Sequence, residues 1–349
     1  MRKKLRIGVI GLGNIADIHA GAIKESANAE LVSAYSSKPQ KAEAFAKKHD
    51  IAGFDSWDKF ISDPNLDAVS ICTPNGTHLD FGRKTAEAGK HVIVEKPIEV
   101  TMERARSLIN ICKENGVQLA VIYQNRFLDK MVETKQLIEE GKLGRLIMCD
   151  AYVKWYRSQE YYDSGEWRGT IALDGGGVLI NQAIHTIDLL QWLVGDAESV
   201  FGSTGTFNHK LEGEDNAVAT LRFKNGAIGV IQASTSVQPA QARRLELHGE
   251  NGSVIIEDND VKVLLIENNQ EKSTETDNTQ PKESTGASSP LGGFSAEPHK
   301  KQFEAIASAI EKNETPIVSG EESLKSLAIV LAIYKSAETG KSVIPDEIG

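Results

Sequence analysis

The feature that most constrains the fold is the stretch LRIGVIGLGNIADIHAGAIKES, residues 5–26. Its apolar start, Leu5–Ile10, predicts a buried strand, and apolar residues at helical spacing follow the glycine turn. Glycines here let the backbone turn sharply and approach a pyrophosphate, which the free N–H groups of the helix start stabilise. We therefore expect a dinucleotide-binding turn made by Gly11, Gly13, Asn14 and Ile15. A plain strand-to-helix turn is the alternative.

The end of the second expected strand, residues 30–35, indicates which dinucleotide is preferred. An enzyme strict for NAD usually has an acidic residue there, which accepts hydrogen bonds from the adenosine ribose. This chain has Ser36, Ser37 and Lys38, two hydroxyls and a cation that suit a 2′-phosphate. We therefore expect NADP to be favoured over NAD. In the alternative interpretation, the Ser-Ser-Lys-Pro sequence only begins the next helix.

Strands and helices continue to alternate up to residue 126, which predicts a parallel, doubly wound sheet. Such sheets bind ligands at the carboxyl ends of their strands. The residues expected to contact the cofactor at that edge are Thr73, Pro74, Asn75, His78, Glu95, Lys96 and Gln124. Asn125 lies at the same edge and is expected to contact the substrate. For His78, a cap on the following helix is the alternative.

A lysine at the end of a buried strand is the first candidate for chemistry. The apolar run His91–Val94 leads directly into Glu95, Lys96 and Pro97. Pro97 fixes φ and offers no N–H group, so strand pairing cannot continue past the lysine. We expect Lys96 to be catalytic and to contact the substrate. An ordinary solvent-facing lysine is the alternative, and the buried run before it and the proline after it disfavour that alternative.

From about residue 127 a second pattern begins, in which Asp174 and three glycines precede a helix. Asn181 and His185 are one helical turn apart and share a face of this helix. We expect both to contact the substrate and His185 to be catalytic.

Aromatic and basic residues supply further expected substrate contacts. Tyr156 and Trp167 offer ring faces to a sugar, and the Arg168 guanidinium can bind a carboxylate or a phosphate. A packed cluster at the edge of a sheet is the alternative.

The rest of the second half alternates like antiparallel strands, and Asn225-Gly226 and Asn251-Gly252 are typical hairpin turns. An open sheet with one apolar face needs a cover, so we expect a homodimer or homotetramer formed through it. The polar stretch 266–297 is predicted to be a mobile loop. The expected domains are residues 1–126 and 127–349.

Composition excludes several classes of protein. The chain has 349 residues, which favours two domains, and a formal net charge of −10, which disfavours nucleic acid and anionic membranes as partners. Its three cysteines lack the spacing of a disulfide framework or metal site, and no apolar stretch reaches transmembrane length. We expect a cytoplasmic protein without a metal ion.

The motifs GLGNIA, CTPNGTH, VEKPI, GGGVLINQAIHTIDLLQWL and DNAVATLRFKNG occur in an order that resembles the glucose–fructose oxidoreductase, inositol dehydrogenase and MocA (Gfo/Idh/MocA) family. The resemblance covers nearly the whole chain. It implies a Rossmann domain followed by an α/β domain with a large open sheet. It also implies that Lys96 and His185 flank the substrate carbon beside the nicotinamide. Many sugar and inositol members have an aspartate where this chain has Asn181, so the role of base falls on His185 or Lys96.

The expected activity is hydride transfer between NAD(P) and a secondary hydroxyl of a sugar, cyclitol or nucleotide-sugar acid. The segment VKWYRSQEYYDSGEWRGT is similar to that of UDP-N-acetylglucosaminuronate 3-dehydrogenases and of uncharacterised relatives. One alternative is an NAD-dependent glycosidase of the same fold, which would cleave an aryl sugar without net NADH production. Another is a regulatory protein that binds NADP without turnover, although such a protein has no need of Lys96 and His185.

Overall fold

The structure, a computed structural model, describes residues 4–267, 270–275 and 296–349. The chain divides into two compact units. The first consists of Met1–Phe127 and Ser295–Leu324, and the second of Leu128–Phe294 and Lys325–Gly349.

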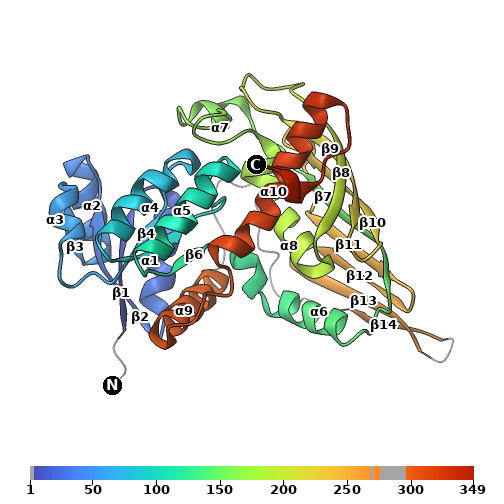
Figure 1. The fold of residues 1–349 in the computed structure, drawn as a ribbon, viewed down its shortest axis with the longest axis horizontal. Helices are drawn as coiled ribbons and strands as arrows, with labels where there is room; N and C mark the ends of the chain where they lie inside the picture. The colour runs from blue at the N-terminus through green and yellow to red at the C-terminus, as the bar shows by residue number, and fades with distance from the viewer. Residues whose placement is uncertain (1–3, 268–269, 276–295) are drawn as a thin grey trace. The chain divides into compact units, whose positions relative to one another are not determined.

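The first unit is built on a six-stranded parallel sheet in the order β3-β2-β1-β4-β5-β6, which confirms the expected Rossmann architecture (Figure 1). Its strands are β1 (Leu5–Ile10), β2 (Ala29–Tyr35), β3 (Ala52–Phe54), β4 (Ala68–Ile71), β5 (His91–Val94) and β6 (Leu119–Val121). Its helices are α1 (Asn14–Glu25), α2 (Pro39–His49), α3 (Trp57–Ile61), α4 (His78–Glu87), α5 (Met102–Glu114) and α9 (Glu297–Lys312), with short 3₁₀ turns η1 (Asn75–Thr77) and η2 (Gln124–Phe127). Helix α1 packs beside α9, and α4 beside α5.

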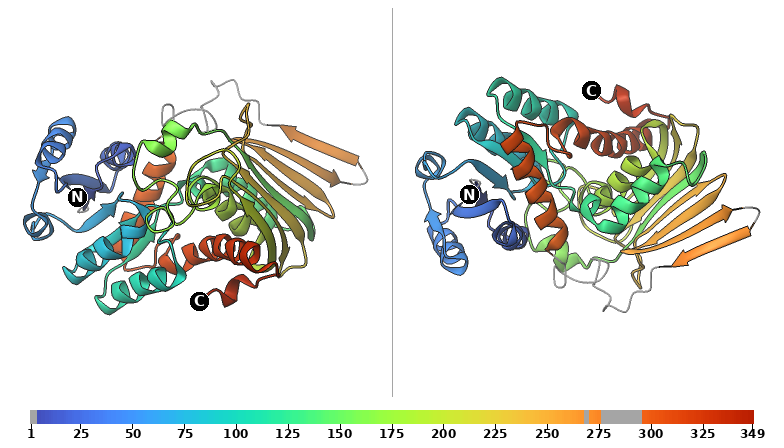
Figure 2. Two further views of the ribbon diagram at one scale, coloured as in Figure 1. Left: turned by 90° about the horizontal axis from the view of Figure 1, so that it is seen from above. Right: turned by 90° about the horizontal axis from the view of Figure 1, so that it is seen from below.

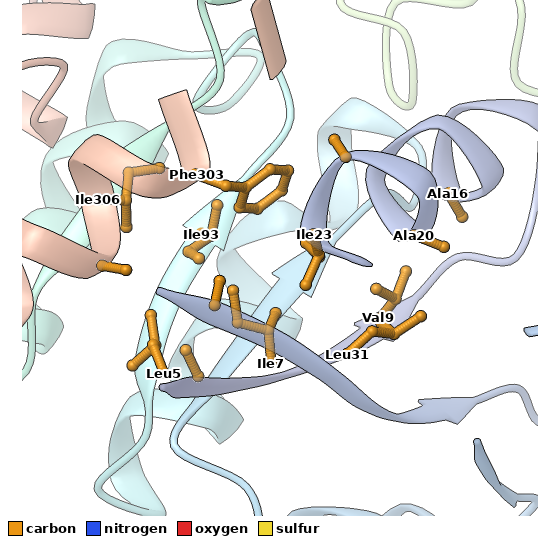
Figure 3. Packing of buried hydrophobic residues seen from close by; sticks show 14 of the residues in the cluster. Leu5, Ile7, Val9, Ala16, Ala20, Ile23, Leu31, Ile93, Phe303 and Ile306 are labelled. Carbon is orange, nitrogen blue, oxygen red and sulfur yellow. The ribbon is translucent and has the colours of Figure 1, made fainter. Parts of the chain in front are cut away.

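The helix α9 comes from late in the sequence but completes the core of the first unit. Phe303 and Ile306 project from α9 into the apolar cluster formed with Ile23 of α1 and Ile93 of β5 (Figure 3). Phe303 is fully buried, and burying a side chain of this kind stabilises a fold by roughly 1.5–3 kcal/mol. The sequence-based boundary placed all residues after 126 in the second domain, whereas residues 296–324 pack with the first unit.

The second unit has an eight-stranded sheet in the order β14-β13-β12-β11-β7-β10-β9-β8. Only the β7–β10 pair is parallel in the described sheet, so the expected open, mainly antiparallel sheet is confirmed. The strands are β7 (Leu146–Lys154), β8 (Ala197–Gly205), β9 (Asn216–Phe223), β10 (Ile228–Ser234), β11 (Arg244–Gly249), β12 (Gly252–Glu257), β13 (Asp260–Glu267) and β14 (Gln270–Glu275). The helical elements are α6 (Asp129–Glu139), α7 (Gln159–Asp163), η3 (Val178–Ala183), α8 (Ile184–Val194), the later part of α10 (Gly320–Thr339) and η4 (Pro345–Glu347).

The two faces of this sheet differ in their surroundings. Helix α8 packs on β7 and β11, and Ile333 of α10 lies against Gly202 of β8. Along β9, Ala217, Ala219 and Leu221 are buried while Val218 between them is 53% exposed. Strands alternate in this way when only one face is covered. Figure 2 shows the twisted sheet with its helices on one side.

The stretch predicted as a mobile loop, 266–297, needs a correction. Gln270–Glu275 is the edge strand β14, whose register with β13 runs from Lys262 opposite Glu275 to Glu267 opposite Gln270. This polar segment has a weak intrinsic strand preference, so pairing with β13 rather than local sequence determines its conformation. Helix α9 begins at Glu297. Residues 268–269 and 276–295 lie outside the described residues.

Candidate active site

The glycine turn of the first unit has room for an anion at the start of α1. Gly11 has a φ of +77°, and a Cβ there would lie 2.4 Å from the carbonyl carbon of Cys72, so only glycine fits. A Cβ on Gly13 would meet nothing closer than 3.9 Å. Gly13 is the N-cap of α1 and gives no side-chain cap to the helix. The helix therefore offers N–H groups to a ligand, and Gly13 with the exposed Asn14 allows close approach.

Lys96 is the one residue between Val92 and Val100 that is not buried. Val92, Ile93 and Val94 of β5 are buried, and Glu95 and Pro97 on either side of the lysine are also buried. The Glu95 carboxylate Oε2 accepts the backbone N–H of Lys96 at 3.1 Å. The lysine is thus displayed from a tightly held turn, as expected from the sequence.

His78 differs from the other residues that were expected to contact the cofactor. It is fully buried at the start of α4, with Nδ1 2.9 Å from the Pro97 carbonyl oxygen and Nε2 3.1 Å from that of Thr73. Burial lowers the pKa of His78, against the opposing charge of Glu99. A buried ring engaged on both sides supports the two loops and leaves no surface for a ligand, so we revise its expected role to support.

The remaining expected residues of the first unit lie in the loops after β2, β4 and β6. Thr73 Oγ1 accepts a hydrogen bond from the Thr77 hydroxyl at 2.8 Å, which orders the turn. Asn75 is 6% exposed, whereas Gln124 and Asn125 are half-buried at the start of η2. Ser36 Oγ accepts the backbone N–H of Lys38 at 3.2 Å.

In the second unit, Asn181 and His185 are the only residues between Asp174 and Gln191 that are not buried. The sequence predicted one continuous α-helix here, but the segment begins with the π-helical turn η3 before α8. π-turns widen a helix locally and are frequent at functional sites. Asn181 and His185 are therefore the half-buried residues of an otherwise buried segment.

A buried carboxylate holds the start of this helix. Glu214 Oε2 accepts the N–H of Gly177 at 3.0 Å, and Oε1 accepts the N–H of Leu179 at 2.8 Å. The hydroxyl of Tyr334 donates to Oε1 at 3.0 Å. Burial raises the pKa of Glu214 to about 7, although these donors act in the opposite direction. A Cβ on Gly177 would lie 1.8 Å from the Glu214 carbonyl oxygen, so glycine at this position serves close packing.

Asp174 orients the polar face of the segment. The Asn181 Nδ2 donates to Asp174 Oδ1 at 2.6 Å, and Gly169 N donates to Oδ2 at 2.8 Å. Asp174 is 1% exposed. The Asn181 amide therefore donates to a buried carboxylate, that of Asp174, in the loop before η3.

Tyr161 is the centre of a cationic and aromatic cluster in the second unit. Its hydroxyl accepts a hydrogen bond from Arg168 Nη1 at 2.7 Å and lies 3.3 Å from Gln182 Nε2. The guanidinium carbons of Arg168 and Arg157 lie 4.4 and 5.2 Å from its ring centroid. Arg168 also lies 4.7 Å from the ring centroid of Trp167. The cluster brings Trp167 and Arg168 together, and their contact with a substrate stays a prediction. Tyr156 is half-buried and forms an isolated antiparallel β-bridge with Ser236.

Sequence reasoning missed several members of this arrangement. Arg157, Tyr161 and Gln182 join the cluster, and Asp174 and Glu214 hold the helix. The run WYRSQEYY could have indicated Arg157 and Tyr161, because it places an arginine among four aromatic residues. Glu214 had no such signal, since its partners lie far from it in the sequence.

A further buried polar cluster occurs in the first unit. His19, Glu95 and His299 have ligand-type atoms within 4.8 Å of one another. The contacts of this cluster are described below.

Comparison with known proteins identifies the family. Residues 5–123 match the Gfo/Idh/MocA profile described as "Oxidoreductase family, NAD-binding Rossmann fold", and residues 135–344 match that of its "C-terminal alpha/beta domain". The chain belongs to the Gfo/Idh/MocA oxidoreductase family. The expected family, fold and NAD-binding domain are thereby confirmed.

Relatives within the Gfo/Idh/MocA family act on several kinds of sugar. The 1,5-anhydro-D-fructose reductase of Ensifer adhaerens is 29% identical over 345 residues, 97% of both chains. The inositol 2-dehydrogenase of Rhizobium meliloti is 27% identical and covers 97% of this chain and 98% of its own. The WlbA dehydrogenase from Bordetella pertussis, crystallised with NADH and UDP-GlcNAcA, is 33% identical, with a TM-score of 0.83 over 98% of this chain and 99% of its own. None of the helices that the structure describes is long and apolar enough to span a membrane.

Proposed function

We propose that this oxidoreductase transfers a hydride between NAD(P) and a secondary hydroxyl or ketone of an acidic sugar, with a nucleotide-sugar acid as the leading substrate class. The observation that carries this proposal is the cluster around Tyr161, in which Arg157 and Arg168 lie near the ring and can face an anion. A neutral cyclitol needs no such pair of cations.

Each polar group has a defined part in this reaction. NAD(P) supplies the hydride-accepting nicotinamide, and the turn Gly11–Ile15 fits its pyrophosphate. During oxidation of the substrate hydroxyl, Lys96 or His185 would take its proton, since one positioned base is needed. Where His185 is the base, a cationic Lys96 would stabilise the developing alkoxide. Asn181 orients a substrate hydroxyl but cannot take its proton.

Polar atoms within the cluster support a bound ligand there. Among the described residues, Arg168 Nε, Gln182 Oε1 and Trp155 Nε1 are buried and have no hydrogen-bond partner. Buried polar atoms are normally paired, so such atoms indicate sites that a ligand or water completes. The Arg168 and Trp155 nitrogens can donate to carboxylate or phosphate oxygens, the Gln182 oxygen can accept from a hydroxyl, and the rings suit a sugar face.

The test is a screen of cofactor reduction at 340 nm with UDP-sugar acids, neutral aldoses and polyols. We expect sustained reduction with the acids. Arg168→Gln should raise KM for an acidic substrate by about 10–100-fold, because one charge-assisted hydrogen bond contributes about 1.5–3 kcal/mol. Reduction with neutral polyols alone would contradict the acidic substrate, and cleavage of an aryl sugar without net NADH would favour the glycosidase alternative.

Arg145→Gln is the matched control for this variant. Arg145 belongs to the same unit but is a surface residue whose Nη2 lies 2.8 Å from Glu250 Oε1. We expect its KM to equal that of the unaltered enzyme.

We also propose that the chain forms a homodimer or homotetramer through the outer face of the eight-stranded sheet. Phe201, Val218 and Ile228 are 47%, 53% and 44% exposed on neighbouring strands. Exposed apolar side chains grouped in this way favour association. Light scattering of Val218→Lys should give a smaller mass than the unaltered protein, and equal masses would contradict this interface. We further propose a cytoplasmic location, which cell fractionation tests.

A further inference from the structure

His19 forms a buried contact with the residue that precedes Lys96. Its Nε2 lies 2.7 Å from Glu95 Oε1, and its Nδ1 lies 2.8 Å from Ser70 Oγ. His19 is fully buried, and Glu95 is 7% exposed. Four elements or their ends thus meet here: α1 supplies His19, β4 supplies Ser70, the end of β5 supplies Glu95, and α9 supplies His299.

The charges in this cluster favour an ion pair between His19 and Glu95. Burial alone would lower the pKa of His19, but the Cys72 sulfur and the Glu95 carboxylate raise it to about 10. Burial would raise the pKa of Glu95, but the hydrogen bond and charge of His19, followed by the charges of Lys96 and His299, lower it to about 2. At neutral pH the pair is therefore charged. The polar and titratable groups that face it are Ser70, Cys72, Lys96 and His299.

Glu95 transmits this contact to Lys96. One carboxylate oxygen accepts from His19 while the other accepts the Lys96 N–H at 3.1 Å. On the other side of the lysine, the Pro97 carbonyl faces Nδ1 of His78 at 2.9 Å. Both peptide neighbours of Lys96 are therefore held by buried histidines, while the lysine itself is half-buried.

A metal ion is a weaker explanation of the same cluster. Ligand atoms on a tetrahedral zinc ion lie about 3.3 Å apart, because each bond is about 2.0–2.1 Å. The distance of 2.7 Å between His19 Nε2 and Glu95 Oε1 is that of a direct hydrogen bond.

We propose that the buried His19–Glu95 pair positions Lys96. The pair fixes the turn from which the lysine side chain extends, and it keeps a carboxylate charge beside the lysine. His19 and Glu95 act through Lys96 and do not touch the substrate. This proposal rests on the proposed role of Lys96 in hydride transfer.

The test compares His19→Ala, His19→Gln and Glu95→Gln. His19→Ala removes the imidazole ring and should lower kcat by about 10–100-fold with little change in KM, because displacement of Lys96 affects the chemical step. The glutamine amide can donate in place of Nε2, so His19→Gln should recover most of kcat. Glu95→Gln keeps the shape but removes the charge, and should move the limb of the pH–rate profile that reports Lys96 to lower pH by about one unit.

A second readout does not require turnover. Competitive acetylation of Lys96 across a pH series, followed by peptide mass spectrometry, should show a displaced profile in Glu95→Gln and His19→Ala, with exposed Lys59 unchanged. If the unaltered protein oxidises no sugar but the Lys96 profile still moves, the proposed activity fails while the positioning role stands. Unchanged acetylation and pH–rate profiles in folded His19→Ala and Glu95→Gln would overturn the proposal.

His49→Ala is the matched control for His19→Ala. His49 Nε2 lies 2.8 Å from Asp17 Oδ1, so this substitution also removes a histidine–carboxylate contact made with α1, two residues from His19. We expect neither kcat nor the Lys96 profile to change. An effect equal to that of His19→Ala would overturn the proposal, because it would assign the loss to general destabilisation of α1.

Discussion

Nε2 of His19 and Oε1 of Glu95 are 2.7 Å apart in the interior of the Rossmann unit, one residue from the lysine proposed to be catalytic. The pair explains why an acid precedes this lysine in the chain. Glu95 cannot serve as an exposed base, because its carboxylate is already engaged by His19 and by the Lys96 N–H. Glu95 supports the turn, and Lys96 is the group proposed for the chemistry.

Replacing the lysine tests the chemistry directly. We expect Lys96→Ala to lower the rate of hydride transfer by about two to four decades, the usual contribution of a positioned acid or base. Cofactor affinity should stay within a few-fold, since the pyrophosphate is expected at the Gly11–Ile15 turn. Stopped-flow kinetics and cofactor fluorescence measure the two quantities. Lys59→Ala on α3 is the control, and full activity in Lys96→Ala would refute the assignment.

Asn181→Asp should create a conflict that the sequence did not reveal. The new carboxylate would face Asp174 Oδ1, which now accepts from Asn181 Nδ2 at 2.6 Å. Two carboxylates at this distance share a proton, so one pKa rises strongly. We expect a loss of about 1–3 kcal/mol in the free energy of unfolding at pH 8, and a smaller loss at pH 5.

The exchanged pair supplies the control for that variant. Asp174→Asn combined with Asn181→Asp restores one amide and one carboxylate, and should recover much of the stability at pH 8. Denaturant titrations at both pH values measure the effect. Equal stability of Asn181→Asp and the unaltered protein at pH 8 would show that the two side chains separate freely.

His299 should make the protein sensitive to acid. Both ring nitrogens are buried without a hydrogen-bond partner among the described residues. Burial, and then the charge of His19, lower the pKa of His299 from 6.5 to about 3. Its stabilising contribution is complete above pH 6.5 and is lost as the pH falls from 6.5 towards 3, because the unfolded chain binds the proton more readily.

The substitution His299→Leu removes this titration. We expect the fall in unfolding free energy between pH 7 and pH 4.5 to shrink by about 2–3 kcal/mol. Urea titrations at the two pH values give the difference. An unchanged fall would mean that His299 is protonated in the folded protein at little cost.

The first unit could be predicted well because its signals are local. The run Leu5–Ile10 has the length and composition of a buried strand, and the glycine turn after it has one common structural use. The position of Lys96 followed from the same logic, since strand ends meet at one edge. The role of His19 did not follow, because its partners Ser70 and Glu95 are 51 and 76 residues away.

Other features depend on packing that the sequence pattern does not specify. An amphipathic helix such as α9 requires an apolar partner, but its spacing of Phe303 and Ile306 does not say which unit supplies it. The π-turn at Val178–Ala183 and its cap by Glu214 likewise need the neighbouring strand in place.

The preference between cofactors is the last prediction. Ser36 Oγ accepts the Lys38 N–H at 3.2 Å, which supports the helix-start interpretation for that residue. Ser37 and Lys38 are exposed and can still face a 2′-phosphate. One partly exposed, charge-assisted hydrogen bond contributes about 1–2 kcal/mol, so we expect about tenfold tighter binding of NADP than of NAD.

Ser37→Asp should reverse this order, because its carboxylate repels the phosphate and accepts from the ribose hydroxyls. Gln40→Asp adds the same charge three residues later, at an exposed position of α2, and should leave the preference for NADP over NAD unchanged. Dissociation constants for both cofactors at one ionic strength decide the matter: equal affinity, or tighter NAD, would mean that this stretch only begins α2.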